Sequence, residues 1–161
     1  MTRNLNLACW RLETPIGPLV IAGDRDAVQF IRFHGQADPA WTVDRAPFTD
    51  AIEQLRAYFA GKLTTFKLPL RPSGTEFQKQ VWTQLQTIPF GSTTTYGAVA
   101  QAIGRPAAIR AVGAANGANP IPIVIPCHRV IGRNGKLTGF GGGLPTKEKL
   151  LKLESPQLHI L

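Results

Sequence analysis

Long apolar runs are missing from this chain of 161 residues, although 43% of its residues are hydrophobic. No stretch approaches the roughly 20 consecutive apolar residues of a membrane-spanning helix, so we expect no membrane partner. The first residues, MTRNLNLACWRLE, contain no apolar core of a signal peptide, which favours the cytoplasm. With 17% charged and 8% aromatic residues, the composition is typical of a globular protein rather than a disordered one.

Cysteine and histidine are also scarce, with two cysteines and three histidines in the whole chain. Two thiols, Cys9 and Cys127, fit a reducing compartment better than a disulfide framework, although the sequence leaves a bridge between them open. A zinc site needs about four closely spaced ligands, and here the candidates are scattered apart from the adjacent Cys127 and His128. We therefore expect neither a metal ion nor another cofactor.

Acidic residues are absent between Glu76 and Glu148, an interval that contains seven lysines and arginines. Residues 1–70 hold eight basic and seven acidic residues, whereas residues 71–161 hold ten and three, so most of the net charge of +8 lies in the second half. A basic tract without carboxylates lowers the cost of approaching a polyanion, and nucleic acid is the first candidate. The alternative is a basic surface that only aids solubility.

The N-terminal half predicts a small α/β domain. Three short segments rich in β-forming residues are separated by Pro and Gly turns and predict antiparallel strands: 7–13, 18–23 and 28–33. Residues 48–59 have apolar side chains at helical spacing and predict a helix. Asp50 with Glu53 matches a capping box at its start, and Gly61 is a suitable stop at its end.

The second half predicts a mainly helical domain. Residues 67–75 contain two prolines and a glycine and form the predicted linker, which divides the chain into domains 1–70 and 71–161. A helix begins near Thr75, and two short helices follow, separated by a Gly-Arg-Pro turn, which matches the helix-turn-helix pattern. The predicted fold is thus α+β, with a small N-terminal unit of short antiparallel strands plus a helix, and a mainly helical C-terminal unit containing a helix-turn-helix.

The second helix of this pair carries a single arginine on a surface of small side chains. Arg110, Ala114 and Gly117 share a face, and further alanines lie near it, at 107, 111 and 115. Small side chains let a helix backbone approach another surface closely, and tight helix packing is the simplest reason for them. An unpaired arginine inside such packing is costly, so the pattern favours a surface pressed against nucleic acid.

The segment IVIPCHRVI (123–131) is apolar at both ends and places a thiol, an imidazole and a guanidinium in its middle. A lone cysteine is usually a small core residue, but Cys127 stands beside His128, a base that could activate it. A catalytic histidine usually needs a carboxylate to orient it. Glu154 shares the apolar face of Leu150 and Leu151 and therefore needs a partner, whereas Glu148 stands four residues before a lysine, as in an ordinary surface pair.

With these motifs, residues 74–154 resemble the catalytic domain of the O6-alkylguanine-DNA alkyltransferases, and the N-terminal half loosely resembles that family's accessory domain. The motif PCHRV (126–130) matches the family's active-site signature and follows a Tyr-Gly pair, a helix-turn-helix and an Asn-Pro pair in the family's order. The resemblance implies irreversible, single-turnover repair of duplex DNA, in which an alkylated guanine is flipped out and its alkyl group passes to the protein. It implies alkylated double-stranded DNA as the partner, and we expect a monomer.

The resemblance also implies a role for each catalytic residue. Cys127 is the nucleophile, and His128 is its base, acting through a water molecule and oriented by Glu154. Asn119 is a hinge that helps to order this network. Tyr96 presses on the DNA backbone and donates a proton to the leaving guanine.

For DNA binding, the resemblance makes Arg110 the finger that fills the gap left by the flipped base. The resemblance also implies that the second helix binds in the minor groove of DNA. This groove is only about 6 Å wide and would accommodate the small face of Ala114, Ala115 and Gly117. We expect Arg129 to be a structural partner of backbone carbonyls rather than a DNA contact.

The base pocket is expected to involve Pro126, Val130, Phe140 and Gly141. Many relatives have tyrosine where this chain has Phe140, and some have serine at Gly141, so side-chain hydrogen bonds to the base are reduced here. The glycine-rich loop 138–143 predicts a roomy pocket that also accepts O4-alkylthymine and alkyl groups larger than methyl. A tight turn is the simpler explanation for the glycines.

Three other functions are compatible with parts of this sequence. An alkyltransferase-like protein binds alkylated DNA without a nucleophile, and the presence of Cys127 argues against it. A helix-turn-helix regulator with an incidental cysteine leaves Glu154 and the PCHRV order unexplained. A Cys-His hydrolase would turn over a simple ester, which an alkyl acceptor does not.

Overall fold

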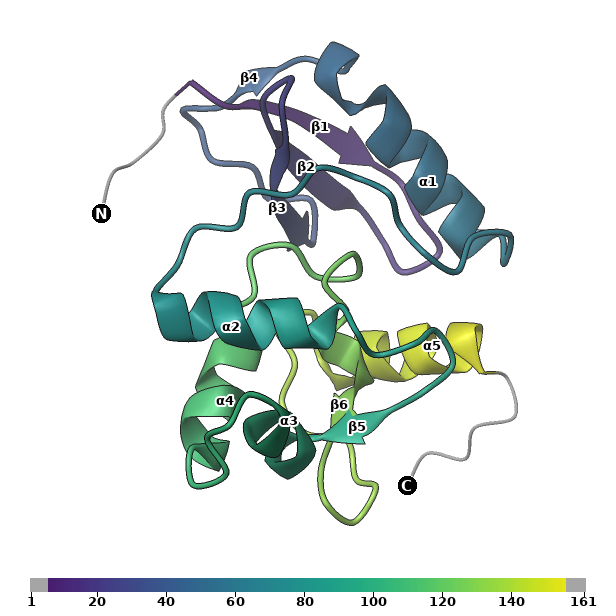
Figure 1. The fold of residues 1–161 in the computed structure, drawn as a ribbon. Helices are drawn as coiled ribbons and strands as arrows, with labels where there is room; N and C mark the ends of the chain where they lie inside the picture. Colours follow the sequence, from purple (N-terminus) through teal and green to yellow (C-terminus); the bar gives the residue numbers. More distant parts are fainter. Residues whose placement is uncertain (1–5, 156–161) are drawn as a thin grey trace. The chain divides into compact units, whose positions relative to one another are not determined.

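The N-terminal unit, up to Pro72, is built on a four-stranded sheet with the strand order β3-β2-β1-β4 (Figure 1). The computed structural model describes residues 6–155, and the strands are β1 (Ala8–Leu12), β2 (Leu19–Gly23), β3 (Val28–Phe33) and β4 (Thr42–Val43). The first three are antiparallel, as predicted, whereas the short β4 runs parallel to β1. The central strand β2 is buried along its whole length, so it anchors the core of this unit.

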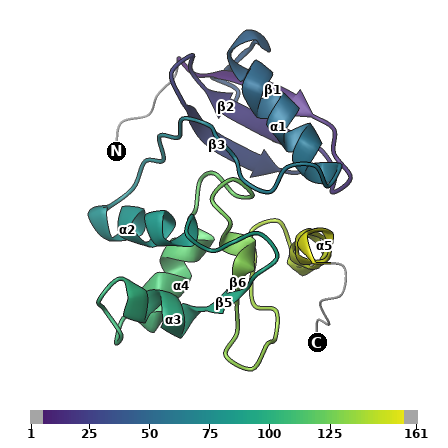
Figure 2. The ribbon, with the colours of Figure 1, turned by 45° about the vertical axis from the view of Figure 1, so that its right-hand side comes forward.

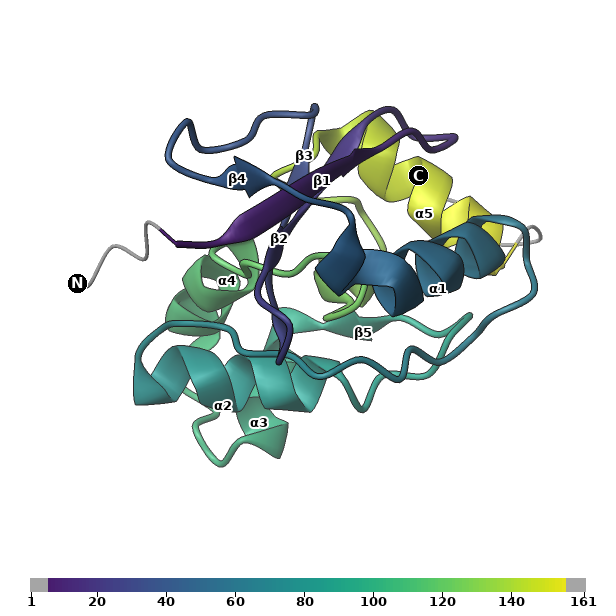
Figure 3. The ribbon, with the colours of Figure 1, turned by 90° about the horizontal axis from the view of Figure 1, so that it is seen from above.

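Helix α1 (Thr49–Phe59) lies across one face of this sheet (Figures 2 and 3). It buries Ile52, Leu55 and Tyr58, the apolar positions that its helical spacing requires. The capping box predicted at Asp50 is wrong, because the 3-10 turn η1 (Ala46–Phe48) runs directly into the helix, and Phe48 caps it without a side-chain bond. The predicted stop is present, with Gly61 at a φ of 74° just beyond the end.

The C-terminal unit begins at Ser73 and is mainly helical. Its elements are α2 (Glu76–Leu85), β5 (Thr94–Thr95), α3 (Tyr96–Ala102), α4 (Ile109–Gly117), the 3-10 turn η2 (Cys127–Arg129), β6 (Val130–Ile131) and α5 (Leu144–Glu154). A capping box between Thr75 and Gln78 starts α2, which packs against α3 and α4. The indole of Trp82 donates to the carbonyl of Ala115 at 2.8 Å and so ties α2 to α4.

The short parallel pair β5 and β6 brings two distant segments together, pairing Thr94 with Val130 and Thr95 with Ile131. Because α3 begins directly after β5, this pairing fixes the helix-turn-helix next to the segment that carries Cys127. The α+β fold with its helix-turn-helix is confirmed. Within residues 6–155, no helix is long and apolar enough to cross a membrane.

The apolar segment before Cys127 is not the strand that its sequence suggests. Residues 121–126 are fully buried, but they form turns, with one isolated bridge between Pro122 and Ile125. Prolines at 120, 122 and 126 remove three backbone donors, and Ile123 has a φ of 75°, which no strand accommodates. The backbone therefore turns sharply into η2, and Cys127 lies at the start of that 3-10 turn.

Candidate active site

Cys127 is held rigidly at the beginning of η2, where it is only 4% exposed. Its backbone nitrogen donates to the carbonyl of Ile125 at 2.8 Å. Its own carbonyl accepts from the backbone of Val130 and, at 3.4 Å, from Nδ2 of Asn116 in helix α4. The backbone of Cys127 is therefore fixed by the turn itself and by the second helix of the helix-turn-helix.

Glu154, the last residue of α5, binds both of the polar residues that follow Cys127. Its Oε2 lies 2.7 Å from Nε2 of His128 and accepts from Nη2 of Arg129 at 3.0 Å, while its Oε1 accepts from Nε of Arg129 at 2.7 Å. Nη1 of Arg129 also donates to the carbonyl of Ile88 at 2.6 Å. Glu154 thus has the buried partners that its place on an apolar helical face requires, and Arg129 contacts a backbone carbonyl as expected. Glu148 forms the exposed pair with Lys152.

The geometry defines the protonation of His128. Because a Glu154 oxygen is an acceptor, Nε2 carries the hydrogen and Nδ1 presents a lone pair. Burial lowers the pKa of His128, against the hydrogen bond and charge of Glu154, which raise it. His128 is fully buried, and its Nδ1 has no hydrogen-bond partner among the described residues. A neutral imidazole with a free lone pair therefore stands next to Cys127 in the chain, ready to accept a proton.

The thiol itself is a weak acid in this setting. Burial raises the pKa of Cys127 to about 11, although a hydrogen bond from Asn119 and the charge of Lys147 act in the opposite direction. At pH 7 only about one molecule in ten thousand would carry a free thiolate. Cys127 thus needs a base at the moment it reacts, because the site does not hold a preformed thiolate.

Asn119 braces the turn that leads to Cys127. Its Nδ2 donates to the carbonyl of Ile125 at 2.8 Å, and its Oδ1 accepts from the backbone of Ile121 at 3.0 Å. Together with its hydrogen bond to the thiol, these contacts place Asn119 at the junction between α4 and η2. The hinge role that the resemblance implies for Asn119 stays a prediction.

Lys147 is a residue of this site that the sequence argument missed. It is fully buried in α5, and its Nζ donates to the carbonyl of Val130 at 2.7 Å and to that of Thr138 at 3.4 Å. Burial lowers the pKa of Lys147 to about 8, while the charge interaction with Cys127 raises it. The sequence does indicate that Lys147 is buried, because it lies at helical spacing from Leu150, Leu151 and Glu154 and shares their buried face. Among residues 6–155, no three His, Cys, Asp or Glu side chains come together as possible metal ligands.

The predicted pocket residues lie in two segments, one around η2 and the other in the loop between β6 and α5. Pro126 and Val130 are buried, and Phe140 is partly exposed, in the loop between β6 and α5. A Cβ added at Gly141 would meet no atom within 4 Å, so this position borders open space. Tyr96, the first residue of α3, reaches the same loop, where its hydroxyl lies 2.5 Å from that of Thr138.

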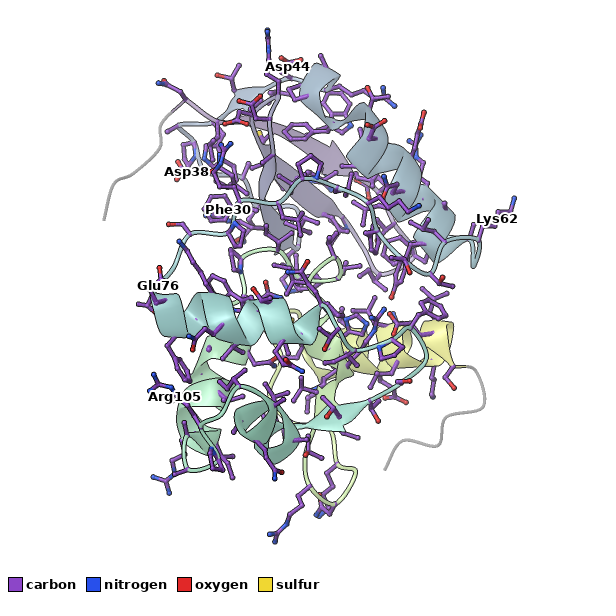
Figure 4. All side chains as sticks on the ribbon, in the orientation of Figure 1. Phe30, Asp38, Asp44, Lys62, Glu76 and Arg105 are labelled. Carbon is purple, nitrogen blue, oxygen red and sulfur yellow. The ribbon has the colours of Figure 1, made fainter. Side chains whose placement is uncertain are left out.

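The outer face of α4 carries Arg110, Ala114 and Gly117, all exposed as expected. One placement differs from the sequence prediction. Ala115 is buried, at 2% exposure, and faces α2, so it cannot contact DNA. Ile109, the first residue of α4, is 48% exposed, and its side chain lies 3.7 Å from the position that a Cβ on Gly97 of α3 would occupy. Arg105 lies at the turn between the two helices (Figure 4). Its guanidinium carbon is 5.8 Å from the ring centre of Phe77 in α2.

The chain is similar in sequence and structure to known proteins of one family. Residues 76–156 match the DNA binding domain of 6-O-methylguanine DNA methyltransferase, and residues 9–72 match its ribonuclease-like domain. The methylated-DNA–protein-cysteine methyltransferase of Methanosarcina acetivorans is 52% identical over 147 residues, covering 88% of this chain and 94% of that protein. The chain belongs to the 6-O-methylguanine DNA methyltransferase family.

Solved structures of this methyltransferase family agree with the fold described above. The crystal structure of Mycobacterium tuberculosis O6-methylguanine methyltransferase has a TM-score of 0.87 at 48% identity, covering 95% of each chain. The structure of Mycobacterium tuberculosis OGT in complex with DNA has a TM-score of 0.88 at 50% identity, covering 92% of this chain and 93% of that one. The matched DNA binding domain contains every residue of the site built here.

Proposed function

We propose that this protein repairs DNA by moving an alkyl group from O6 of guanine to its own Cys127, as a methylated-DNA–protein-cysteine methyltransferase. The observation that carries the proposal is the buried Cys127 beside a neutral His128 whose Nε2 lies 2.7 Å from Glu154. Relatives that are 52% identical bear that name, and a relative of nearly identical fold is known in complex with DNA. Partner and reaction thus follow from the family and from the chemistry of the site together.

The reaction balances with the groups present. The sulfur of Cys127 attacks the alkyl carbon, the carbon–O6 bond breaks, and its electron pair stays with guanine. The thiol proton passes to Nδ1 of His128 through a water molecule, and Tyr96 gives a proton to the leaving guanine. The chain regains its starting protonation through solvent, while the carbon–sulfur bond of the thioether persists.

Proton transfer accompanies the attack rather than preceding it. The Cys127 pKa is about 11, whereas that of His128 lies below its ordinary value of 6.5. A preformed pair of thiolate and imidazolium would therefore be strongly uphill. Glu154 stabilises the positive charge that develops on His128, and the ammonium group of Lys147 favours the negative charge that develops on sulfur.

DNA binding uses the exposed face of α4. A helix surface of Ala114 and Gly117 can enter a narrow minor groove, and Arg110 projects from it to take the place of the flipped base. The carboxylate-free basic tract supplies attraction to phosphate, which predicts binding that weakens steeply with salt. We propose a monomer located in the cytoplasm.

The lesion range should extend beyond O6-methylguanine. The open space at Gly141 and the absence of a hydroxyl on Phe140 leave recognition to shape and backbone groups. We therefore expect repair of O6-ethylguanine and O4-methylthymine as well. Single-turnover rates on the three lesions in one duplex sequence test this, and undetectable repair of both unusual lesions would refute the open-pocket interpretation without affecting the main proposal.

The competing functions are separated by simple measurements. An alkyltransferase-like binding protein would bind lesion-containing DNA and leave its own mass unchanged. A Cys-His hydrolase would turn over an activated ester many times. The methyltransferase proposal requires one added alkyl group on the peptide that contains Cys127 and no ester turnover.

A further inference from the structure

The hydroxyl of Thr138 lies 2.5 Å from the hydroxyl of Tyr96, a contact between two segments 42 residues apart. Tyr96 is the first residue of α3, and Thr138 belongs to the loop between β6 and α5. Both side chains are partly buried. The bond therefore connects the beginning of the helix-turn-helix to the loop that borders the base pocket.

The backbone carbonyl and the methyl group of Thr138 have contacts of their own. Lys147 donates to its carbonyl at 3.4 Å and to the carbonyl of Val130 at 2.7 Å, and the Lys147 side chain is fully buried. The methyl group of Thr138 lies 3.4 Å from the position that a Cβ on Gly132 would occupy, so the side chain also packs against the start of the loop. The Thr138 hydroxyl is thus presented to Tyr96 from a braced position.

We propose that Thr138 is a positioning residue that orients the Tyr96 hydroxyl and assists it as the proton donor to the leaving guanine. This inference rests on the proposed function. Two hydroxyls that share one hydrogen bond keep one hydrogen for a third partner. When guanine accepts the hydrogen of Tyr96, the bond between the hydroxyls runs from Thr138 to Tyr96, so both bonds exist at once.

Thr138 assists through a hydrogen bond and transfers no proton itself. As the carbon–O6 bond breaks, the O–H bond of Tyr96 breaks and its proton goes to guanine. Thr138 keeps its own proton and donates a hydrogen bond to the phenolate oxygen that forms. A hydrogen bond to a charged group is stronger than one to a neutral group, so the contact stabilises the transition state more than the resting site.

Two variants at one position separate the hydroxyl from the rest of the side chain. Thr138→Val removes the hydroxyl at nearly constant volume, and Thr138→Ser keeps the hydroxyl and removes the methyl group. Neither change touches the backbone carbonyl that Lys147 binds. For each variant, the single-turnover rate of methyl transfer from an O6-methylguanine duplex and the affinity for that duplex are measured, and thermal unfolding checks the fold.

We expect Thr138→Val to slow methyl transfer roughly three- to ten-fold, the value of one hydrogen bond, with duplex affinity unchanged. Thr138→Ser should transfer within about twofold of the wild-type rate. In a Tyr96→Phe background, Thr138→Val should cause no further loss, because the group it assists is gone. A residue that only holds the loop would slow transfer equally in both backgrounds.

Three results would overturn the inference: a wild-type rate for Thr138→Val, an equal loss for Thr138→Ser, or additive losses in the Tyr96→Phe background. Failure of the proposed function gives a different result. In that case the wild-type protein itself transfers no methyl group, and the inference falls with the function. Normal wild-type transfer with an unaffected Thr138→Val variant would overturn the role of Thr138 alone.

Discussion

Replacing Glu154 by glutamine tests the buried network that orients His128. The substitution preserves shape but removes the negative charge and turns one acceptor into an amide donor. Glu154 accepts from Arg129 through both oxygens, so either orientation of the amide places its NH2 group against an Arg129 donor. The side chains of Glu154 and Arg129 are 1% and 7% exposed, and breaking such a pair leaves a buried charge uncompensated.

We expect Glu154→Gln to lower the free energy of unfolding of the C-terminal unit by about 3 kcal/mol, the lower end for a broken buried pair, because Arg129 keeps the Ile88 carbonyl. With a urea m-value of about 1.5 kcal/mol/M, the unfolding midpoint falls by about 2 M. Methyl transfer should also slow, because the amide no longer fixes the hydrogen on Nε2 of His128 or favours its positive form.

The assay follows unfolding through the fluorescence of Trp82, in a background where Trp10 and Trp41 are phenylalanine, so that only the C-terminal unit reports. The matched control is Glu148→Gln on the same helix, which breaks an ion pair whose side chains are 42% and 55% exposed. It should change the free energy of unfolding by no more than about 0.5 kcal/mol. An unchanged midpoint for Glu154→Gln, or equal shifts for the two variants, would refute the buried-network reasoning.

Three further predictions concern the reaction and its DNA contact. Cys127→Ser should abolish transfer and keep duplex affinity, as measured by gel shift, because serine lacks the nucleophile but retains volume; lost affinity would contradict this. Arg110→Ala should slow repair of duplex DNA more than reaction with the free base O6-methylguanine, and equal losses would count against a finger role. In His128→Gln, the rate of reaction with the free base should rise about tenfold per pH unit up to the Cys127 pKa near 11, because thiolate then forms only by ionisation, whereas a flat profile would exclude His128 as the base.

The pairing of His128 with Glu154 could be predicted from the sequence, because it follows from the chemical requirements of the two side chains. Glu154 stands on an apolar helical face, where a carboxylate requires a partner, and His128 requires a carboxylate. Because each residue requires the type of partner that the other provides, the pair could be predicted without the structure. The same periodicity placed Lys147 on that face as well, but a buried lysine bound only to carbonyls is unusual, and its acceptors at Val130 and Thr138 come from other segments.

The path of the backbone around the site was harder to predict than the partners of its polar side chains. The run IVIP has the composition of a buried strand, and it is buried, but the spacing of Pro122 and Pro126 turns it into a sequence of bends. The burial of Ala115 and the exposure of Ile109 depend on how α4 rotates against α2, which a helix of small residues specifies poorly. The bond between Tyr96 and Thr138 likewise depends on the pairing of β5 with β6, two strands of two residues each.

The most direct test of the account is the intact mass of the protein after incubation with an excess of O6-methylguanine duplex, followed by peptide mapping. The account predicts a single added methyl group per molecule, located on the peptide that contains Cys127 and absent from the peptide that contains Cys9. It also predicts that the number of lesions repaired never exceeds the number of protein molecules. An unchanged mass, a methyl group on another residue, or repair of more than one lesion per molecule would contradict it.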